Sequence, residues 1–163
     1  MDSQFDTIQK YQRSIPVDIR GLASALGLDL YEIPMADSIS GTLSRKGRRF
    51  YIQVNSKHHE NRKRFTIAHE IAHFLLHADL IVSEVVDDAL YRSPQMPSPY
   101  ESQANAYAAE LLMPRNLVAD RYDQLMRAGE PQVVARMAQD FGVSQQAMSI
   151  RLSNVRQVEM RWA

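Results

Sequence analysis

Three histidines and one glutamate interrupt an otherwise apolar segment, "FTIAHEIAHFLLH", at residues 65–77. If this segment is a helix, with about 100° between successive residues, His69 and His73 lie one turn apart on one face and Glu70 lies on the same side. Two imidazoles at this spacing can direct ring nitrogens at a single ion. The H-E-x-x-H pattern therefore predicts two protein ligands of a zinc site, with Glu70 as a general base toward a water molecule.

The residues around this pattern favour a buried helix. Ile67, Ile71 and Phe74 cover the side opposite to the histidines, so the helix is apolar nearly all round. Buried polar groups need partners. The alternative interpretation is a pair of core histidines bonded to the backbone, with Glu70 in a local ion pair. The chain has no cysteine, which excludes thiolate metal sites and leaves histidine and carboxylate ligands open.

A catalytic zinc site needs a third protein ligand from another element. The predicted helix over residues 99–113 carries Glu101 and Glu110 on opposite sides, so only one of them can face the ion. Glu101 also fits a capping box with Ser98, and the residues alone leave its role as ligand or cap open. His77 continues the histidine stripe, but three ligands on one helix give poor tetrahedral geometry. We therefore expect His77 to pack against a ligand or to hold one.

The pattern of the whole chain predicts an α+β fold. A short three-stranded sheet packs on the H-E-x-x-H helix, and a helical module similar to a helix-turn-helix follows. Gly129 and Pro131 mark the clearest boundary in the sequence. This boundary divides the chain into a metal-binding domain over residues 1–128 and a C-terminal module over residues 129–163.

Turn and capping residues set the expected limits of the elements. The hairpin "SGTLSRKGRRFYIQVN" has its turn near Gly47. The H-E-x-x-H helix is expected to begin at Asn55 or Ser56, either of which can cap it, and to end near residue 78. The other predicted elements are a helix over 17–26, a strand over 28–34, a loop over 79–99, helices over 99–113 and 116–127, and a helix, turn and helix over 131–155.

The combination of "RFTIAHEIAHFLLH" with "ESQANAYAAELLMP" resembles the ImmA/IrrE family of bacterial metallopeptidases. "VDIRGLASALGLDLYEIP", the hairpin and "FGVSQQAMSIRLSNV" extend the resemblance over most of residues 15–155. It implies a zincin-like domain, zinc as the cofactor with Mn²⁺ as an alternative in the cell, and Glu101 as the third ligand. It also implies a protein substrate: a helix-turn-helix repressor encoded nearby, whose cleavage relieves repression in a phage, stress or toxin-antitoxin-like system.

Other side chains are candidates for supporting roles in such a site. Asn105 lies one turn after Glu101, where it can hold a ligand histidine by the second ring nitrogen. Peptide hydrolysis usually needs a second donor to the developing oxyanion. The candidates for this donor, among which the sequence does not choose, are Tyr100, Tyr107, His77 and Arg92.

An extended peptide substrate can pair with an edge strand of the small sheet. The "RRFYIQVN" strand or its hairpin partner is the candidate edge. Residues 45–64 contain eight basic residues and one acid, Glu60, whereas residues 79–88 contain four acids and no base. These charges are either solvated faces that attract each other or a docking surface for the substrate.

Composition limits the partners of the chain. Nineteen basic and nineteen acidic side chains cancel over 163 residues, so no overall field attracts nucleic acid or an anionic membrane. No segment approaches the roughly 20 apolar residues of a membrane span, and the start lacks the basic and apolar regions of a secretory signal. Together with the absence of cysteine, this predicts a soluble, cytoplasmic protein without a membrane partner.

The C-terminal segment supports a second class of function. "VVARMAQDFGVSQQAMSIRL" has the helix, glycine turn and second helix of a DNA-binding module, with Ser144 as the cap of the second helix. Gln145, Gln146, Ser149 and Arg151 form only a modest base-reading face, and seven basic residues oppose five acids after Met113. The alternative function is a DNA-binding regulator with a structural or vestigial metal site. Packing against the core, or contact with a repressor, is the favoured role of this module.

Overall fold

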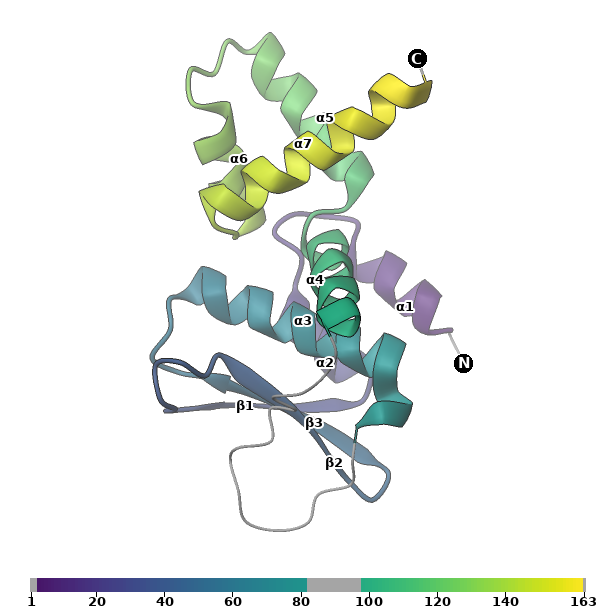
Figure 1. The fold of residues 1–163 in the computed structure, drawn as a ribbon. Coiled ribbons are helices and arrows are strands. Elements are labelled where there is room, and N and C mark those ends of the chain that lie inside the picture. Colours follow the sequence, from purple (N-terminus) through teal and green to yellow (C-terminus); the bar gives the residue numbers. More distant parts are fainter. Residues whose placement is uncertain (1–2, 82–97, 163) are drawn as a thin grey trace.

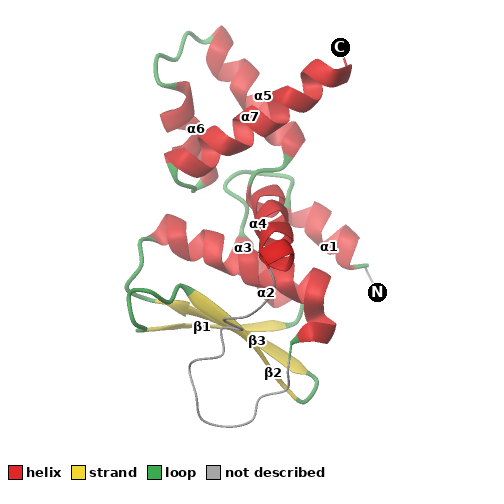
Figure 2. Cartoon of the chain, in the orientation of Figure 1, coloured by secondary structure: helices red, strands yellow, loops and turns green. Residues whose placement is uncertain are grey.

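The computed structural model describes residues 3–81 and 98–162 (Figure 1). A small sheet lies at one end, helices cover one of its faces, and three further helices form the opposite end (Figure 2). This architecture confirms the α+β class and the three-stranded sheet. The strands are β1 (Leu28–Ile33), β2 (Gly41–Lys46) and β3 (Arg49–Asn55). The helices are α1 (Gln4–Tyr11), α2 (Ile19–Ala25), α3 (Glu60–His77), α4 (Ser98–Leu112), α5 (Arg115–Arg127), α6 (Val133–Phe141) and α7 (Gln145–Trp162), and a short 3-10 helix spans Ala78–Leu80.

The sheet has the order β1-β3-β2, so β3 is its central strand. β1 pairs with β3 in parallel from Leu28 opposite Phe50, and β2 pairs with β3 antiparallel as a hairpin. The prediction that "RRFYIQVN" is an edge strand is therefore wrong, because this segment is β3, which has a neighbouring strand on each side. Its hairpin partner β2 is an edge of the sheet and remains the candidate for pairing with a peptide.

Helix α3 packs across β2 and β3 and forms the centre of the core. Ile52 and Val54 on β3 and Ile67 and Ile71 on α3 are all fully buried. Burial of a side chain of this size stabilises the fold by about 1.5–3 kcal/mol. The predicted apolar side of the H-E-x-x-H helix is thus the side that packs in the core.

The start of α3 differs from the prediction. Asn55 does not cap the helix but is the fully buried last residue of β3, where its amide donates to the carbonyls of Ala36 and Ile39. The helix begins at Glu60, and the ring of His59 caps it by accepting from the Asn61 backbone N–H at 3.1 Å. Asn55 is a good helix cap in isolation, but the loop before it requires its side chain.

The N-terminal helices also add detail to the predicted pattern. Helix α1 was not predicted, although Ser3 and Asp6 form a capping box around its first turn. Helix α2 begins at Ile19, two residues later than expected, because the Asp18 side chain accepts from the Gly21 backbone N–H at 2.9 Å. Most of the predicted loop over residues 79–99 lies outside the described residues. The candidate oxyanion donor Arg92 lies outside them as well.

A tight turn joins α6 to α7. Gly142 ends α6 in the left-handed conformation, with φ of 64°, which glycine adopts without steric cost. The hydroxyl of Ser144 accepts from the Ala147 backbone N–H at 3.1 Å, so Ser144 caps α7 as predicted. Helices α5, α6 and α7 contact one another at the end of the molecule away from the sheet (Figure 1).

Two arginines connect these C-terminal helices to the rest of the chain. Arg64 on α3 donates to the carbonyls of Val17 at 2.8 Å and of Gly142 at 3.1 Å. Arg151 on α7 is buried and donates to the Met113 carbonyl at 2.9 Å. In the described ranges, no helix is both long and apolar enough to cross a membrane.

Candidate metal centre

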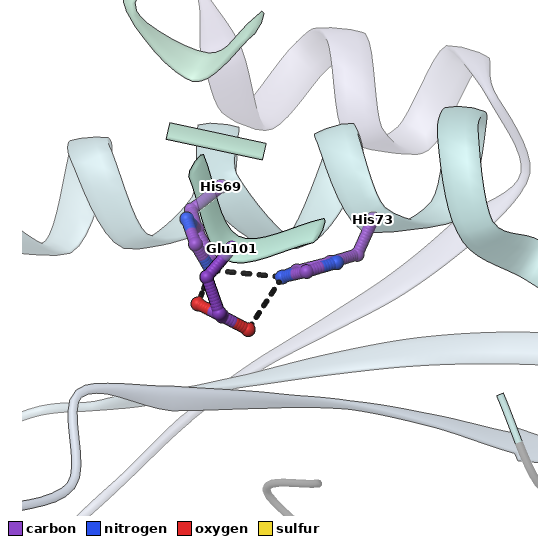
Figure 3. A group of neighbouring side chains, drawn as sticks. All are labelled: His69, His73 and Glu101. Carbon is purple, nitrogen blue, oxygen red and sulfur yellow. Dashed lines mark hydrogen bonds and ion pairs between the residues drawn. The ribbon is translucent and has the colours of Figure 1, made fainter. Parts of the chain in front are cut away.

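Side chains from α3 and α4 converge at one point (Figure 3). The Nε2 atoms of His69 and His73 lie 3.0 Å apart. The carboxylate of Glu101 on α4 contacts both rings: its Oε2 atom lies 3.2 Å from His69 Nε2, and its Oε1 atom lies 3.2 Å from His73 Nε2. Within the described residues these three side chains form a group that could hold a metal ion. The fold thus brings together the residues singled out from the sequence as ligands.

The outer nitrogen of His69 is held by Asn105. His69 Nδ1 and Asn105 Oδ1 are 2.9 Å apart. Because an amide oxygen accepts and does not donate, Nδ1 carries the proton, and Nε2 of the neutral ring presents a lone pair to the site. Asn105 lies one turn after Glu101, where the sequence analysis placed it.

The outer nitrogen of His73 is held by a longer chain of bonds. His77 Nε2 donates to Gln103 Oε1 at 2.9 Å, so in the neutral form of this ring Nδ1 is an acceptor. That atom lies 3.0 Å from His73 Nδ1, which must then donate to it and leave His73 Nε2 as a lone pair. The ring of Tyr100 packs edge-on against His77, with centroids 4.9 Å apart. Both outer contacts therefore produce the same tautomer in the two ligand candidates.

Burial keeps His73 neutral. Burial in the protein, reinforced by the neighbouring His69 ring, lowers the pKa of His73 to about 4, although Glu101 opposes this shift. His73 is therefore in the uncharged form that binds metal ions at neutral pH. The side chain of His73 is 7% exposed and that of Glu101 is 44% exposed, so the group borders solvent on the side of the carboxylate.

The donor group fits a zinc ion by its chemistry and its spacing. Tetrahedral zinc with bonds of about 2.0–2.1 Å places its ligand atoms about 3.3–3.4 Å apart. The observed separations of 3.0–3.2 Å are close to this edge length. Two imidazoles and one carboxylate are typical zinc ligands, whereas Ca²⁺ and Mg²⁺ prefer oxygen donors. Two lone pairs and a carboxylate this close repel one another unless a cation or a proton lies between them.

The remaining candidates divide between the site and the scaffold. Glu70 follows His69 on α3 and is 6% exposed. Glu110 turns away from the group and forms an ion pair with Arg151, so one of the two glutamates of α4 faces the site, as the helical spacing predicted. Tyr107 lies on α4, and burial raises the pKa of its hydroxyl. Gln103 was not singled out from the sequence, because its contact with His77 depends on how α3 and α4 cross.

The fold and this donor group define an α+β domain with a candidate metal centre shared by two helices. The profile of the peptidase M78 family, described as the IrrE N-terminal-like domain, matches residues 23–153. The chain therefore belongs to this family, the ImmA/IrrE metallopeptidases, as its motifs predicted.

Curated relatives support this assignment at modest identity. The chain is 40% identical over 70 residues to the radiation response metalloprotease IrrE of Deinococcus deserti, and 32% identical over 93 residues to that of Deinococcus radiodurans. These alignments cover 42% and 57% of this chain, but only 24% and 27% of the two relatives. The chain is also 29% identical over 107 residues to the uncharacterized immunity region protein 2 of Bacillus phage phi105. This alignment covers 66% of this chain and 63% of the phage protein.

Proposed function

We propose that the chain is a zinc-dependent endopeptidase that cleaves a specific protein. The observation that carries this proposal is the convergence of His69 Nε2, His73 Nε2 and the Glu101 carboxylate within 3.2 Å of one another. These three side chains would hold the metal ion, and Mn²⁺ could replace zinc in the cell. Three protein ligands leave a position open, as catalytic zinc sites do, whereas structural sites use four.

Each group at the site would have a separate role in peptide hydrolysis. A bound zinc ion would supply Lewis-acid polarisation of the peptide carbonyl and lower the pKa of water to near 7. Glu70, buried beside His69 on the same helix, would accept a proton from the attacking water and then donate it to the leaving amine. The half-exposed carboxylate of Glu101 would border the face from which the substrate arrives.

Asn105, His77 and Gln103 would act as positioning residues. Asn105 holds the ring of His69, and the bond from His77 to Gln103 holds the ring of His73 through Nδ1. Such outer partners fix the tautomer and the orientation of ligand rings, and their loss typically costs 10–100-fold in metal affinity. The two ligand rings would therefore be ordered before the ion binds.

The proposed substrate is a helix-turn-helix repressor encoded nearby, whose cleavage would release its target genes. The resemblance to the ImmA/IrrE family implies this substrate, and the name of the phage relative, an immunity region protein, is compatible with it. Strand β2, an edge of the sheet that contacts α3, would pair with the backbone of the cleaved segment.

The structure gives less support to the alternative, a DNA-binding regulator. Arg151, one of four residues assigned to the base-reading face, is 8% exposed and bonds to Met113 and Glu110 inside the protein. Gln145, Gln146 and Ser149 remain exposed but carry no charge for phosphate contacts. We propose that α6 and α7 pack against the metal-binding part or contact a protein. The division into residues 1–128 and 129–163 stays a prediction.

Cleavage of the neighbouring repressor tests the proposed activity. The full chain would be incubated with zinc and the repressor encoded beside its gene, and the fragments measured by mass spectrometry. Replacement of Glu70 by Gln removes the general base, so we expect the rate to fall by about 10²–10⁴-fold while zinc binding remains.

Glu60→Gln is the matched control, because Glu60 is also on α3 but is half-exposed and pairs with Arg20 and Lys63. It should cleave at the wild-type rate. Cleavage by the Glu70→Gln variant at that same rate would remove Glu70 from its proposed role.

A further inference from the structure

The hairpin of β2 and β3 ends in a group of cations, one half-buried and three exposed, that the proposed chemistry does not use. Arg45, Lys46, Arg48 and Arg49, hereafter the hairpin-tip cations, lie within five consecutive positions. Among the described residues, the only acid paired with them is Asp29, which bonds Arg49 at 3.0 Å. The tip therefore has a net positive charge that this part of the chain does not neutralise.

Contacts with α3 show how β2 lies along the candidate metal centre. At one end of β2, a Cβ on Gly41 would lie 2.5 Å from Thr66 on α3. At the other end, Arg45 pairs with Phe50, whose ring contacts Phe74 with centroids 5.0 Å apart. The four steps from Gly41 to Arg45 on a strand and the eight steps from Thr66 to Phe74 on a helix both span about 12–13 Å. Because β2 also contacts α3 directly, the strand runs alongside the helix. His69, Glu70 and His73 lie between these two contacts, level with the middle of the strand.

Arg45 lies on the face of the sheet that packs against α3. It shares this face with Phe50, and its guanidinium lies over the Phe50 ring, 5.4 Å from the centroid. Its Nε donates to the Gly47 carbonyl, and the remaining N–H groups of the guanidinium have no carboxylate partner within the described residues. A peptide paired with β2 would place one side chain near Arg45, about two residues from the part level with the metal centre.

We infer that the cleaved segment carries acidic residues on the amino-terminal side of the scissile bond, where the hairpin-tip cations bind them. This inference rests on the proposed function and adds a specificity determinant to it. In an antiparallel pair with β2, the substrate runs from the Lys46 end toward the Gly41 end, so its amino-terminal half lies at the tip. A carboxylate there can form a bidentate pair with Arg45, and Lys46 and Arg48 raise the local positive potential.

Binding of three labelled peptides of about ten residues tests this inference. The peptides share one neutral sequence; the first has two Asp residues in its amino-terminal half, the second has them in its carboxy-terminal half, and the third has Asn at both positions. We expect fluorescence anisotropy at about 20 mM salt to show that the full chain binds the first peptide about three- to tenfold tighter than the third. The preference should shrink at about 0.5 M salt.

Three double variants distinguish the hairpin-tip cations from the general positive charge of the chain. Arg45→Gln with Arg48→Gln should abolish the preference for the first peptide. Lys10→Gln with Arg127→Gln, which removes the same charge from exposed positions on α1 and α5, should keep it. Lys46→Gln with Arg48→Gln, which leaves the packing of Arg45 on Phe50 intact, should reduce it. Equal binding of the first and third peptides, or a preference that survives loss of Arg45 and Arg48, would overturn the inference.

The same binding assay also tests the direction of the bound peptide and the chemical class of the ligand. Tighter binding of the second peptide would show that the substrate runs in the opposite direction and would reject the antiparallel pairing. A single-stranded oligonucleotide that binds the tip more tightly than the first peptide would show that nucleic acid is its ligand. Mass spectrometry of the same mixtures separates the two proposals: cleavage without a preference for acid rejects only the present inference, and a preference for acid without cleavage rejects only the peptidase.

Discussion

The metal-centre region and the C-terminal helices both bury ionisable side chains, but they use them differently. On α7, Arg151 directs its guanidinium at the Met113 carbonyl and the Glu110 carboxylate, so its charge is neutralised within the chain. On α3, His69 and His73 make their outer bonds through Nδ1, and their Nε2 lone pairs face each other beside Glu101. Burial alone therefore does not identify a binding site, whereas the convergence of two imidazole nitrogens and a carboxylate on one point does.

Of the changes considered, removal of a metal ligand should have the largest effect, and this effect should be on zinc affinity. His69→Ala deletes one of the two Nε2 donors, so zinc affinity should fall by more than the about 100-fold that loss of an outer partner costs. Competition with a chromogenic chelator measures this affinity, and circular dichroism checks the fold.

His58→Ala is the control, because His58 bonds to the Asp37 carbonyl in a loop away from the metal centre. It should bind zinc as the unchanged chain does. Equal zinc affinity in the His69 and His58 variants would show that the ion binds elsewhere.

Loss of the buried Arg151 should lower the stability of the fold and leave the metal centre unchanged. Arg151→Met leaves the Met113 carbonyl without its donor, which should destabilise the fold by about 1–3 kcal/mol, or about 2–4 °C in Tm for each kcal/mol. Thermal unfolding measures this change, and zinc affinity should stay the same.

Arg136→Met provides the matched control on α6, because its pair with Asp140 is half-exposed and worth at most about 1 kcal/mol. If Arg151→Met were as stable as Arg136→Met, the proposed structural role of Arg151 would be wrong.

The outer chain of bonds should have a smaller effect than the ligands. Gln103→Leu removes the acceptor of His77, which frees the His77 and His73 rings to change tautomer, and zinc affinity should fall about tenfold. The same chelator competition measures it. Gln146→Leu on the exposed face of α7 should leave the affinity unchanged, and a similar loss in both variants would count against a positioning role.

The smallest change in stability should follow from loss of a charge in an exposed group of ion pairs that connects α2, β1 and α3. A hydrogen bond from Lys63 lowers the pKa of Glu32, and one from Arg20 lowers the pKa of Glu60. Because the folded pKa lies below the ordinary value near 4.5, the stabilisation is present at neutral pH and is lost as pH falls through the folded pKa.

Each exposed pair contributes about 0.2–1 kcal/mol. Glu32→Gln should therefore be slightly less stable than the unchanged chain at pH 7, and this difference should shrink as the pH falls below about 4.5, as measured by urea unfolding. A stability difference that persisted at low pH would point to packing instead of charge.

Local patterns predicted the parts of the site that lie on a single helix. The faces of α3 followed from the spacing of His69, His73 and the apolar residues, and the opposite orientation of Glu101 and Glu110 followed from helical geometry. The choice of Glu101 as ligand came from the family resemblance, since Ser98 offered it an equally good local role.

Contacts between distant elements were not accessible from the sequence. The hairpin pattern indicated that β2 and β3 pair, but the parallel pairing of β1 with β3, which makes β3 central, depends on a crossover through other elements. The position of Gln103 beside His77 depends on the crossing of α3 and α4. Arg151 looked like a surface residue because an isolated arginine on a polar helix usually is one, and only the packing of α7 on Met113 buries it.

The glycine turn between α6 and α7 has a consequence for how the chain unfolds. A Cβ on Gly142 would lie 2.7 Å from Nε of Arg64, the residue of α3 that also bonds the Val17 carbonyl. The turn is therefore in close contact with the same helix that carries the three histidines. Disruption of either side removes hydrogen bonds from the other, so the helical end and the sheet end of the molecule should melt together in a single cooperative transition.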